Sequence, residues 1–579
     1  MLDVFDDEEY KSLFWHSSAH ILAASLKKLY GEDILLGTGP AIKNGFYYDV
    51  YFKKGKFDNK NIEDVEREFI KLCDQNDEFI KRYISKSEAM ELFKDNPLKQ
   101  EIIKDLNDED ISIYQTGCFI DLCKGPHLPR SGVIKAVKIL NISGAFWRGD
   151  EHNQQMTRIY GISFPDKRML EDYLNLLEES KKRDHVKLSQ QLQFFCFSQN
   201  VGLGLPLWLP RGTVFRNILE GFLREEQLKR GYKHVMTPHI GNINLYKTSG
   251  HYDKYGEDAF KVIKTPNEGE EYMLKPMNCP HHCEIYRSSP RSYRDLPLRL
   301  AEFGTVYRYE KHGELNGILR SRSFTQDDAH IFCRKEDVES EISNIIDLIK
   351  YVFNKLGFEK LKARLSLHET SDFNRYIGSQ EDWLIAEKAL EDVASKNDLA
   401  IEKAYGEAAF YGPKLDFIVS DVLGRSWQLG TIQLDYQLPA RFDLVYTNDK
   451  NEKERPVMIH RAPLGSIERI TAILLEHTDG RLPVWLAPEQ VRILIVANDV
   501  LEYASSVFNI LRGKGVRVEF DDRNEKLGRK ILDANNLKIP YMVIIGQKEQ
   551  QENLLCVRQG GQQNNEIMNI EDFITLVLK

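Results

Sequence analysis

Apolar residues recur along this chain with two periods, three to four residues in predicted helices and two in predicted strands. Residues 16–30 have helical apolar spacing, and residues 47–52 are typical of a strand within a mixed α/β region. Residues 168–194 are charged, place apolar residues three and four apart, and contain no Gly or Pro. This pattern predicts a long, solvated helix that joins two domains.

Pro- and Gly-rich sequence at residues 202–212 opens a second region. There the pattern predicts a helix over 214–231, a strand near 232–237, a core of antiparallel strands with one polar face, and a closing helix after Gly465. From residue 491 onward, short apolar runs alternate with helical segments, which predicts a small α/β layer with a largely parallel sheet. The expected fold class is α+β multidomain, divided into residues 1–167, a linker helix at 168–194, and regions at 195–484 and 485–579.

The composition is that of a large globular protein. A chain of 579 residues is too long for one core, and about three or four domains are expected. Hydrophobic residues make up 42%, and no apolar run reaches the roughly 18 residues that a membrane span needs. The acidic start lacks the order of a secretion signal, and eight scattered cysteines are more typical of reduced thiols than of a disulfide framework. We therefore expect a cytoplasmic enzyme; the net charge of −9 argues against a general nucleic-acid binder but does not exclude a local basic surface.

The stretch Ser323–Cys333 carries the most informative alternation. Side chains two residues apart share one face of a strand, so one face carries Phe324, Gln326, Asp328 and His330. An aromatic ring, an amide, a carboxylate and an imidazole make a poor core face and a good substrate floor. A solvated outer face explains this strand alone equally well.

Arginines accompany two Gly-containing segments. Arg308 is expected in the strand before a flexible loop, and Arg320 and Arg322 follow that loop. Guanidinium groups match phosphate oxygens and stack on planar rings, so this arrangement fits nucleotide binding better than a surface role. Arg469 falls in the first turn of the helix that Ser466 opens, where backbone amides favour anions. An ordinary capped helix with a surface arginine is the alternative.

Six longer segments are similar to class II aminoacyl-tRNA synthetases, and in detail to threonyl-tRNA synthetases. They are KPMNCP (275–280), RSYRDLPLRLAEFG (291–304), FTQDDAHIF (324–332), AFYGPK (409–414), WQLGTIQLD (427–435) and MIHRAPLGSIER (458–469). The tetrapeptide HIGN at 239–242 superficially resembles the ATP signature of the other synthetase class, but it lies mid-domain and no KMSKS-like partner follows. The resemblance implies a class II antiparallel-sheet catalytic core, an N-terminal α+β editing domain and a C-terminal α/β anticodon-binding domain.

The resemblance also implies one zinc ion per subunit, held by Cys279, His330 and His460. Three protein ligands leave the metal an open position for substrate. Valine has the shape of threonine without its hydroxyl, so a site built to bind that hydroxyl should reject valine by about 10⁴-fold or more. Serine keeps the hydroxyl and lacks one methyl, which discriminates by only about 10–200-fold. The pocket is therefore expected to accept serine too often.

Further roles follow by resemblance. Arg308, Arg469 and Gln326 are expected to act in catalysis, with Mg²⁺ accompanying ATP. Arg308 would clamp the α-phosphate and Arg469 the γ-phosphate, while Phe324 would stack on adenine. The full ATP-binding set is Arg308, Arg320, Phe324, Gln326, Lys414, Gln428, Ser466 and Arg469. The residues expected to orient threonine are Asp328, Tyr411 and Gln433.

A compact Cys/His cluster near the start of the chain looks like a second metal site. His16 and His20 are four apart on one helix face, and Cys123 and His127 have the same spacing across a Gly-Pro turn. The resemblance identifies this quartet instead with a pocket that hydrolyses serine mischarged on threonine tRNA, and implies no metal there. The expected editing residues are His16, His20, Tyr48, Lys99, Asp121, Cys123 and His127, with a His or Lys holding the attacking water. This domain supplies the second sieve that the serine argument requires.

The C-terminal region resembles an anticodon-binding domain, in which Asn524, Glu549 and Arg558 are expected to read exposed bases. Threonine tRNA, ATP, threonine and a second copy in a homodimer are the expected partners. Only about fifteen residues precede His16, so we expect the ubiquitin-like β-grasp domain of bacterial relatives to be absent. Two other functions compete: a non-catalytic, synthetase-like RNA-binding protein, and a metal-dependent hydrolase centred on the His16 quartet. The intact motif arginines argue against the first, and metal analysis separates the second.

Overall fold

The computed structural model describes residue 5 and residues 7–579, and the chain divides into two compact units, residues 1–179 and 180–579. The boundary falls inside helix α5 (Lys167–Lys182). Within the described part, no helix combines the length and the apolar character that a bilayer crossing requires.

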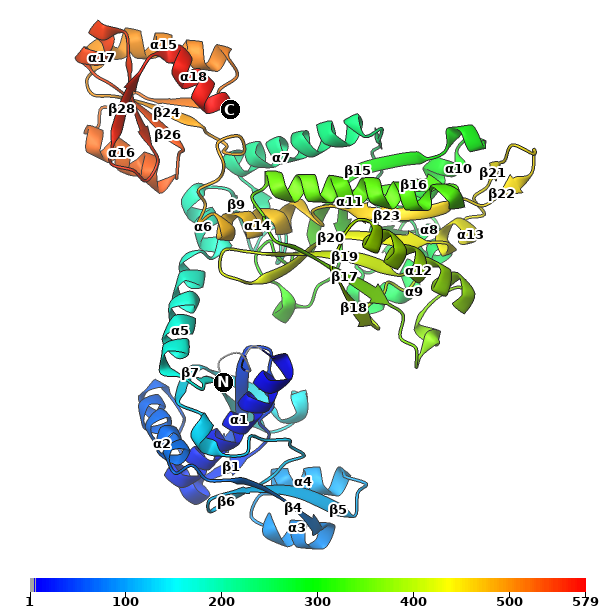
Figure 1. Ribbon diagram of the computed structural model, residues 1–579, viewed down its shortest axis with the longest axis vertical. Helices are drawn as coiled ribbons and strands as arrows, with labels where there is room; N and C mark the ends of the chain where they lie inside the picture. Colours follow the sequence, from blue (N-terminus) through cyan, green and yellow to red (C-terminus); the bar gives the residue numbers. More distant parts are fainter. Residues whose placement is uncertain (1–4, 6) are drawn as a thin grey trace. The chain divides into compact units, whose positions relative to one another are not determined.

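The first unit contains two antiparallel sheets (Figure 1). The larger has the order β1-β3-β8-β7 with β2 on β3, and the smaller has the order β4-β5-β6. The strands are β1 (Ile34–Leu36), β2 (Ala41–Ile42), β3 (Gly45–Phe52), β4 (Phe79–Ser85), β5 (Asp110–Thr116), β6 (Phe119–Leu122), β7 (Ala136–Phe146) and β8 (Gln155–Phe164). The helices before α5 are α1 (Glu8–Tyr30), α2 (Ile62–Asp74), α3 (Lys86–Leu92) and α4 (Pro97–Asp105).

Helix α1 lies at the centre of the first unit's core. Asp7 caps it by accepting a hydrogen bond from the Tyr10 amide, so the helix begins eight residues before the expected start at residue 16. Its buried residues between Phe14 and Leu26 pack against the larger sheet. This packing fixes which way the α1 histidines face.

An eight-stranded sheet dominates the second unit, and its inner pairs are antiparallel as predicted. The order is β11-β15-β16-β23-β20-β19-β17-β18, with the two outermost pairs parallel. The strands are β11 (Lys233–His234), β15 (Leu298–Tyr307), β16 (Ser323–Cys333), β17 (Leu361–Leu367), β18 (Ile401–Tyr405), β19 (Lys414–Ser420), β20 (Ser426–Asp435) and β23 (Val457–Ala462).

The two faces of this sheet differ in chemistry. Ala329 and Ile331 of β16 join the large apolar core on one face, so Asp328 and His330 point to the other. The predicted alternation of this strand is therefore confirmed. The helices that supply the large core are α6 (His185–Leu192), α7 (Pro210–Lys229), α11 (Val338–Lys355), α12 (Gln380–Lys396) and α14 (Ile467–His477).

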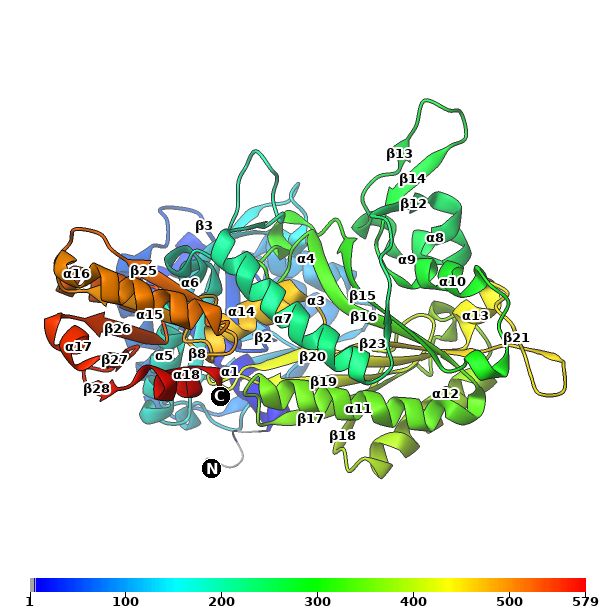
Figure 2. The ribbon, with the colours of Figure 1, turned by 90° about the horizontal axis from the view of Figure 1, so that it is seen from above.

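A second group of helices lies on the polar face. The helices are α8 (Ile243–Ser249), α9 (His251–Tyr255), α10 (Cys279–Arg287) and α13 (Gln437–Arg441). A small sheet of β12 (Ile240–Asn242), β14 (Glu271–Leu274) and β13 (Ile263–Lys264) projects beside α8 and α10 (Figure 2). Two further hairpins are β9 (Phe195–Cys196) with β10 (Leu207–Trp208), and β21 (Tyr446–Thr447) with β22 (Lys453–Glu454).

The segment 168–194 forms two helices where one was expected. The Asp184 side chain accepts hydrogen bonds from two amides in the first turn of α6, which starts a new helix at His185. Leu188 and Leu192 of α6 are buried in the second unit. The segment is therefore not solvated along its whole length.

The last part of the chain is a five-stranded sheet with helices on both faces (Figure 1). In the order β25-β24-β26-β27-β28, β24 is parallel to β25 and β26, whereas the other two pairs are antiparallel. The sheet is thus mixed rather than largely parallel, because β27 and β28 form a hairpin that needs no crossover helix. The elements are β24 (Val491–Ile495), α15 (Leu501–Gly513), β25 (Val518–Asp521), α16 (Leu527–Asn536), β26 (Tyr541–Ile545), α17 (Gln547–Glu552), β27 (Leu555–Gln559), β28 (Asn565–Met568) and α18 (Ile570–Leu578).

Candidate functional site

Three buried side chains meet on the polar face of the eight-stranded sheet. Cys279 is the first residue of α10, His330 lies in β16 and His460 in β23. The two histidines are directly opposite each other in the antiparallel register, and their ring centroids are 4.6 Å apart. One ligand atom from each of the three residues lies within 4.8 Å of the others. The structure therefore gathers the predicted zinc triad.

A chain of hydrogen bonds fixes one ring nitrogen of His330. Its Nδ1 lies 2.8 Å from Nδ1 of His282, whose Nε2 lies 3.2 Å from a Glu302 carboxylate oxygen. A carboxylate can only accept, so a neutral His282 donates from Nε2 and accepts at Nδ1 from His330. This leaves the lone pair of His330 on Nε2. Burial and the neighbouring histidines hold the pKa of His330 well below its usual value, so the ring is neutral, as a metal ligand must be.

His460 is held in the complementary way. Its Nε2 donates to Oδ2 of the fully buried Asp435 at 2.8 Å. Its Nδ1 is buried and has no hydrogen-bond partner among the described residues. A buried acceptor without a partner is costly, so this nitrogen is suited to a ligand. Two imidazoles beside the Cys279 thiol form a donor set that fits zinc.

The thiol itself is in an apolar setting. Sγ of Cys279 lies 3.5 Å from Nε2 of His251. Burial, with Asp328 nearby, raises the pKa of the Cys279 thiol well above its usual value. A bound cation would reverse that preference, because a metal deprotonates a coordinating thiol.

The residues predicted to orient threonine lie next to the triad. Gln433 of β20 is directly opposite His460, and the hydroxyl of Tyr411 donates to its Oε1. The Tyr411 ring stacks on His460 with centroids 5.0 Å apart. Asp328 is two residues from His330 on the same strand face and accepts from the Asn278 amide at 3.0 Å. All three predicted residues are thus grouped around one end of the metal site.

Cations and an aromatic ring lie farther along the same face. Arg308 follows directly after β15 rather than lying within it, and its guanidinium carbon is 5.2 Å from the centroid of Phe324. Ser466 caps α14 by accepting a hydrogen bond from the Arg469 backbone amide at 3.1 Å. Its backbone also pairs with Gln326 in an isolated antiparallel β-bridge. The Nε atoms of Arg308 and Arg469 are buried without a hydrogen-bond partner in the described part of the chain. Burial lowers the pKa of Arg469, as does Arg320 nearby, and such a concentration of positive charge suits a polyanion.

Three of the predicted ATP residues do not belong to the group that contains Arg308, Phe324 and Arg469. Arg320 is half exposed and pairs with Glu310 and Glu314. Lys414 is opposite Gln433 in the sheet, and its Nζ lies 2.8 Å from the buried Asp416. Gln428 is exposed near the start of β20 and, among the described residues, contacts none of the triad by a hydrogen bond.

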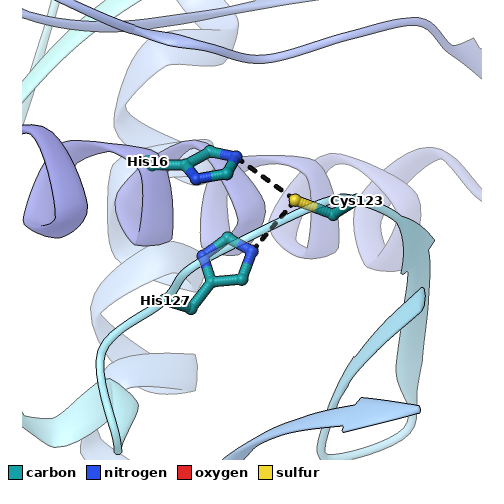
Figure 3. Close-up of side chains that lie close together, drawn as sticks. All are labelled: His16, Cys123 and His127. Atoms are coloured by element: carbon teal, nitrogen blue, oxygen red, sulfur yellow. Dashed lines mark hydrogen bonds between the residues drawn. The ribbon is translucent and has the colours of Figure 1, made fainter. Parts of the chain in front are cut away.

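All seven predicted editing residues line one cavity of about 920 Å³ in the first unit. Nζ of Lys99 lies 2.7 Å from Oδ1 of Asp121, and the Tyr48 hydroxyl donates to the other oxygen at 2.6 Å. Sγ of Cys123 lies 3.2 Å from Nε2 of both His16 and His127 (Figure 3). These three residues also satisfy the spacing of a metal site.

Burial controls the ionisation of this pocket. It lowers the pKa of His20 to about 4 and raises the pKa of the Cys123 thiol. His20 is therefore a neutral imidazole near pH 7, and Nε2 of this ring is buried without a partner among the described residues. Such a nitrogen can accept a hydrogen bond from a water molecule, and its lowered pKa makes it a weak base.

The structure separates Asn524 from the other two predicted anticodon residues, Glu549 and Arg558, which both lie near Cys556. Asn524 is exposed in the loop after β25, which β24 and β26 separate from β27. Glu549 accepts from the Gly546 amide at 2.9 Å and so caps α17. Arg558 of β27 donates to Asn565 at 2.7 Å.

The sequence interpretation missed the residues that hold the triad in place. His282, Glu302 and Asp435 have no role in it, although His282 stands three residues after Cys279 and Asp435 two residues after Gln433. Both spacings place the missed side chain near a predicted site residue, on the same helix surface or the same strand face. That signal was available in the sequence.

Three family models match the chain. They are "tRNA synthetase class II core domain (G, H, P, S and T)" over residues 260–478, "Anticodon binding domain" over 490–579, and "Threonyl and Alanyl tRNA synthetase second additional domain" over 111–160. These matches confirm the class II core and the two additional domains that the sequence predicted.

Full-length relatives agree. A threonine–tRNA ligase of Porphyromonas gingivalis (strain ATCC 33277) is 54% identical over 99% of this chain and 88% of its own length. One of Cytophaga hutchinsonii is 52% identical over 98% of this chain and 88% of its own length. The crystal structure of the RNA binding domain of threonyl-tRNA synthetase from Cryptosporidium parvum Iowa II matches with a TM-score of 0.65 and 40% identity, covering 68% of this chain and 98% of that one. The chain belongs to the threonine–tRNA ligase family of class II aminoacyl-tRNA synthetases.

Proposed function

We propose that this ligase forms threonyl-adenylate from threonine and ATP, passes the threonyl group to threonine tRNA, and selects threonine with a zinc ion held by Cys279, His330 and His460. One observation carries the zinc assignment. His460 has its Nε2 committed to the buried Asp435, while its Nδ1 is buried without a partner among the described residues, beside the Cys279 thiol and the His330 imidazole.

Selection follows from the chemistry of such a site. Zinc bound there would offer its open positions to the amino group and hydroxyl of threonine. Tyr411, Gln433 and Asp328 surround the same place and are suited to orient the amino acid. Valine cannot satisfy a hydroxyl-binding site, so we expect its kcat/KM to be about 10⁴-fold below that of threonine. Serine loses only the contacts of one methyl group, which should lower kcat/KM by about 10–200-fold.

The cations beside this pocket support the ATP role. The guanidinium carbon of Arg308 lies 5.2 Å from the centroid of the Phe324 ring, so an adenine stacked on that ring would have its phosphates near the guanidinium group. Arg308 would bind the α-phosphate and Arg469, at the N-terminus of α14, the γ-phosphate. Gln326, Ser466, Lys414, Gln428 and Arg320 would line ATP or the adenylate, and Mg²⁺ accompanies ATP. These groups position the reactants and neutralise charge rather than react covalently.

The cavity in the first unit is proposed to hydrolyse seryl-tRNA. Lys99 donates to Asp121 and to Tyr48, which leaves the unpartnered Nε2 of the neutral His20 as the better candidate to hold the attacking water. We propose that this site works without metal. This part rests on the family resemblance, because the outer nitrogens of His16 and His127 contact a backbone carbonyl and a serine hydroxyl, which are also usual partners of metal-binding histidines.

Three further parts of the proposal rest on the family resemblance, and a fourth, the location, rests on the composition. Residues 1–167 would edit, 195–484 would catalyse and 485–579 would bind the anticodon, with 168–194 as connector. Asn524, Glu549 and Arg558 would read anticodon bases. The enzyme would be a homodimer. It would act in the cytoplasm.

Threonine-dependent ATP–pyrophosphate exchange by the zinc-loaded protein tests the activation step. We expect exchange with threonine, weaker exchange with serine and none above background with valine. Absence of exchange with threonine would instead favour a non-catalytic RNA-binding protein.

A further inference from the structure

His185 lies where two elements that carry phosphate-binding arginines come together. It is the first residue of α6, is 1% exposed, and has no place in the activity proposed above. Its contacts reach α14 on one side and the loop between β15 and β16 on the other, all within the second unit.

The contact with α14 is a double hydrogen bond. The backbone amide and the ring Nδ1 of His185 lie 3.1 and 2.7 Å from Oε1 of Glu476, and a carboxylate accepts both. The other Glu476 oxygen lies 2.7 Å from Arg425. Glu476 is near the end of α14, and Arg469 is in its first turn. Two turns of rigid helix thus connect the His185 contact to Arg469.

The contact with the loop is steric. Asn316 and Arg320 close a tight turn through backbone hydrogen bonds of 3.1 and 3.2 Å. Gly317 in this turn has a φ of +50° and presents its Cα to the imidazole. A methyl group on Gly317 would overlap Nε2 of His185 and lie 2.9 Å from Val186. The turn that carries Arg320 therefore rests directly on His185.

We propose that His185 is a positioning residue that sets the spacing between Arg320 and Arg469, and so the affinity of the enzyme for ATP. Nδ1 of the ring is tied to the helix of Arg469, and the Nε2 edge supports the turn of Arg320. Ion pairs with Glu310 and Glu314 hold the Arg320 side chain to the same loop, so a shift of the turn over His185 would change the spacing between the two guanidinium groups. This inference rests on the proposed ATP role of the two arginines.

Steric complementation tests the proposal by ATP–pyrophosphate exchange in the full, zinc-loaded protein. His185→Asn keeps a donor near the position of Nδ1 but vacates the space over Gly317. We expect KM for ATP to rise about five- to twentyfold, with KM for threonine within about twofold, because a misplacement of 1 Å at a binding group can cost up to about 10²-fold. Gly317→Ala should produce a similar defect through overlap, and the double variant should be less impaired than Gly317→Ala alone.

His477→Asn is the matched control. This histidine ends the same helix but accepts a hydrogen bond from the Val422 amide, away from the arginine-bearing turn. This variant should leave KM for ATP within about twofold of the parent value. That range shows how far KM changes when a variant on this helix does not touch the turn of Arg320. A parent-like KM for ATP in His185→Asn, or no relief in the double variant, would overturn the proposal. Arg469→Ala distinguishes this failure from failure of the ATP assignment itself, since only the latter leaves that variant fully active.

Discussion

Asp435 fixes the tautomer of His460, and Asp435→Asn is expected to weaken zinc binding while leaving the shape of the site unchanged. Oδ2 of Asp435 accepts from Nε2 of His460 at 2.8 Å. Oδ1 accepts from the amides of Gln437 and Leu438 at 2.7 and 3.0 Å. All three groups donate to the carboxylate. An asparagine has one oxygen, so it can accept either from His460 or from the two backbone amides.

The size of the effect follows from these contacts. Turning the new NH₂ group toward the two backbone amides would lose two hydrogen bonds to a charged acceptor, each worth about 1.5–3 kcal/mol. The NH₂ group of the new asparagine therefore faces Nε2 of His460. Either the Nε2–H of His460 stays and faces another donor, or the proton moves from Nε2 to Nδ1. The first costs about 1–3 kcal/mol, and the second removes the lone pair that would bind zinc. We expect zinc affinity to fall about 10–100-fold, the usual range for an outer hydrogen-bond partner of a metal ligand.

Competition with a chromophoric chelator measures the zinc Kd, and threonine-dependent pyrophosphate exchange at saturating zinc measures what remains of the site. Asp443→Asn is the control, because it removes the same charge from an exposed residue whose partner is Arg455. The reasoning is refuted if Asp435→Asn binds zinc as tightly as the parent and still rejects valine. His460 would then not be a ligand through Nδ1.

Three other predictions concern the two Cys/His clusters. One zinc per chain should be lost in Cys279→Ala and retained in His16→Ala, as measured by elemental analysis; the reverse would support the hydrolase alternative. His20→Ala should charge threonine normally and let seryl-tRNA accumulate, and a serine misacylation level equal to that of the parent would exclude the editing assignment. Burial lowers the pKa of His20 from 6.5 in the unfolded chain to about 4 in the folded protein. Between pH 6.5 and about pH 4 the unfolded chain therefore binds one more proton than the folded protein. The free energy of unfolding falls as the pH drops through this range, by up to about 3 kcal/mol. Urea unfolding of the parent and of His20→Gln at pH 7 and pH 4.5 should therefore show a larger loss for the parent; equal losses would contradict a neutral, buried His20.

Local patterns predicted the elements of the site well. The two-residue alternation of Ser323–Cys333 and the Ser466 cap depend on near neighbours in sequence, and both are found in the structure. Arg308 was expected in a strand and lies just after one, within the usual uncertainty of a boundary.

Long-range relations were not accessible in this way. The register that places His330 opposite His460 joins residues 130 positions apart, and no local rule sets it. The break of the 168–194 segment depends on the Asp184 side chain capping a new helix, while the apolar spacing continues through it. The mixed C-terminal sheet arose because two successive strands formed a hairpin where the alternating pattern suggested crossovers. Each of these differences comes from tertiary pairing rather than from an error in local propensity.

Aminoacylation of threonine tRNA with threonine, serine and valine, side by side in the parent and in His20→Ala, tests the central claim that zinc selects a hydroxyl and a second site corrects serine. We predict stable threonyl-tRNA from both proteins, no valyl-tRNA from either, and seryl-tRNA that accumulates only in His20→Ala. Valyl-tRNA formation by the zinc-loaded parent would contradict selection by the metal site, and equal seryl-tRNA levels in both proteins would contradict the second sieve.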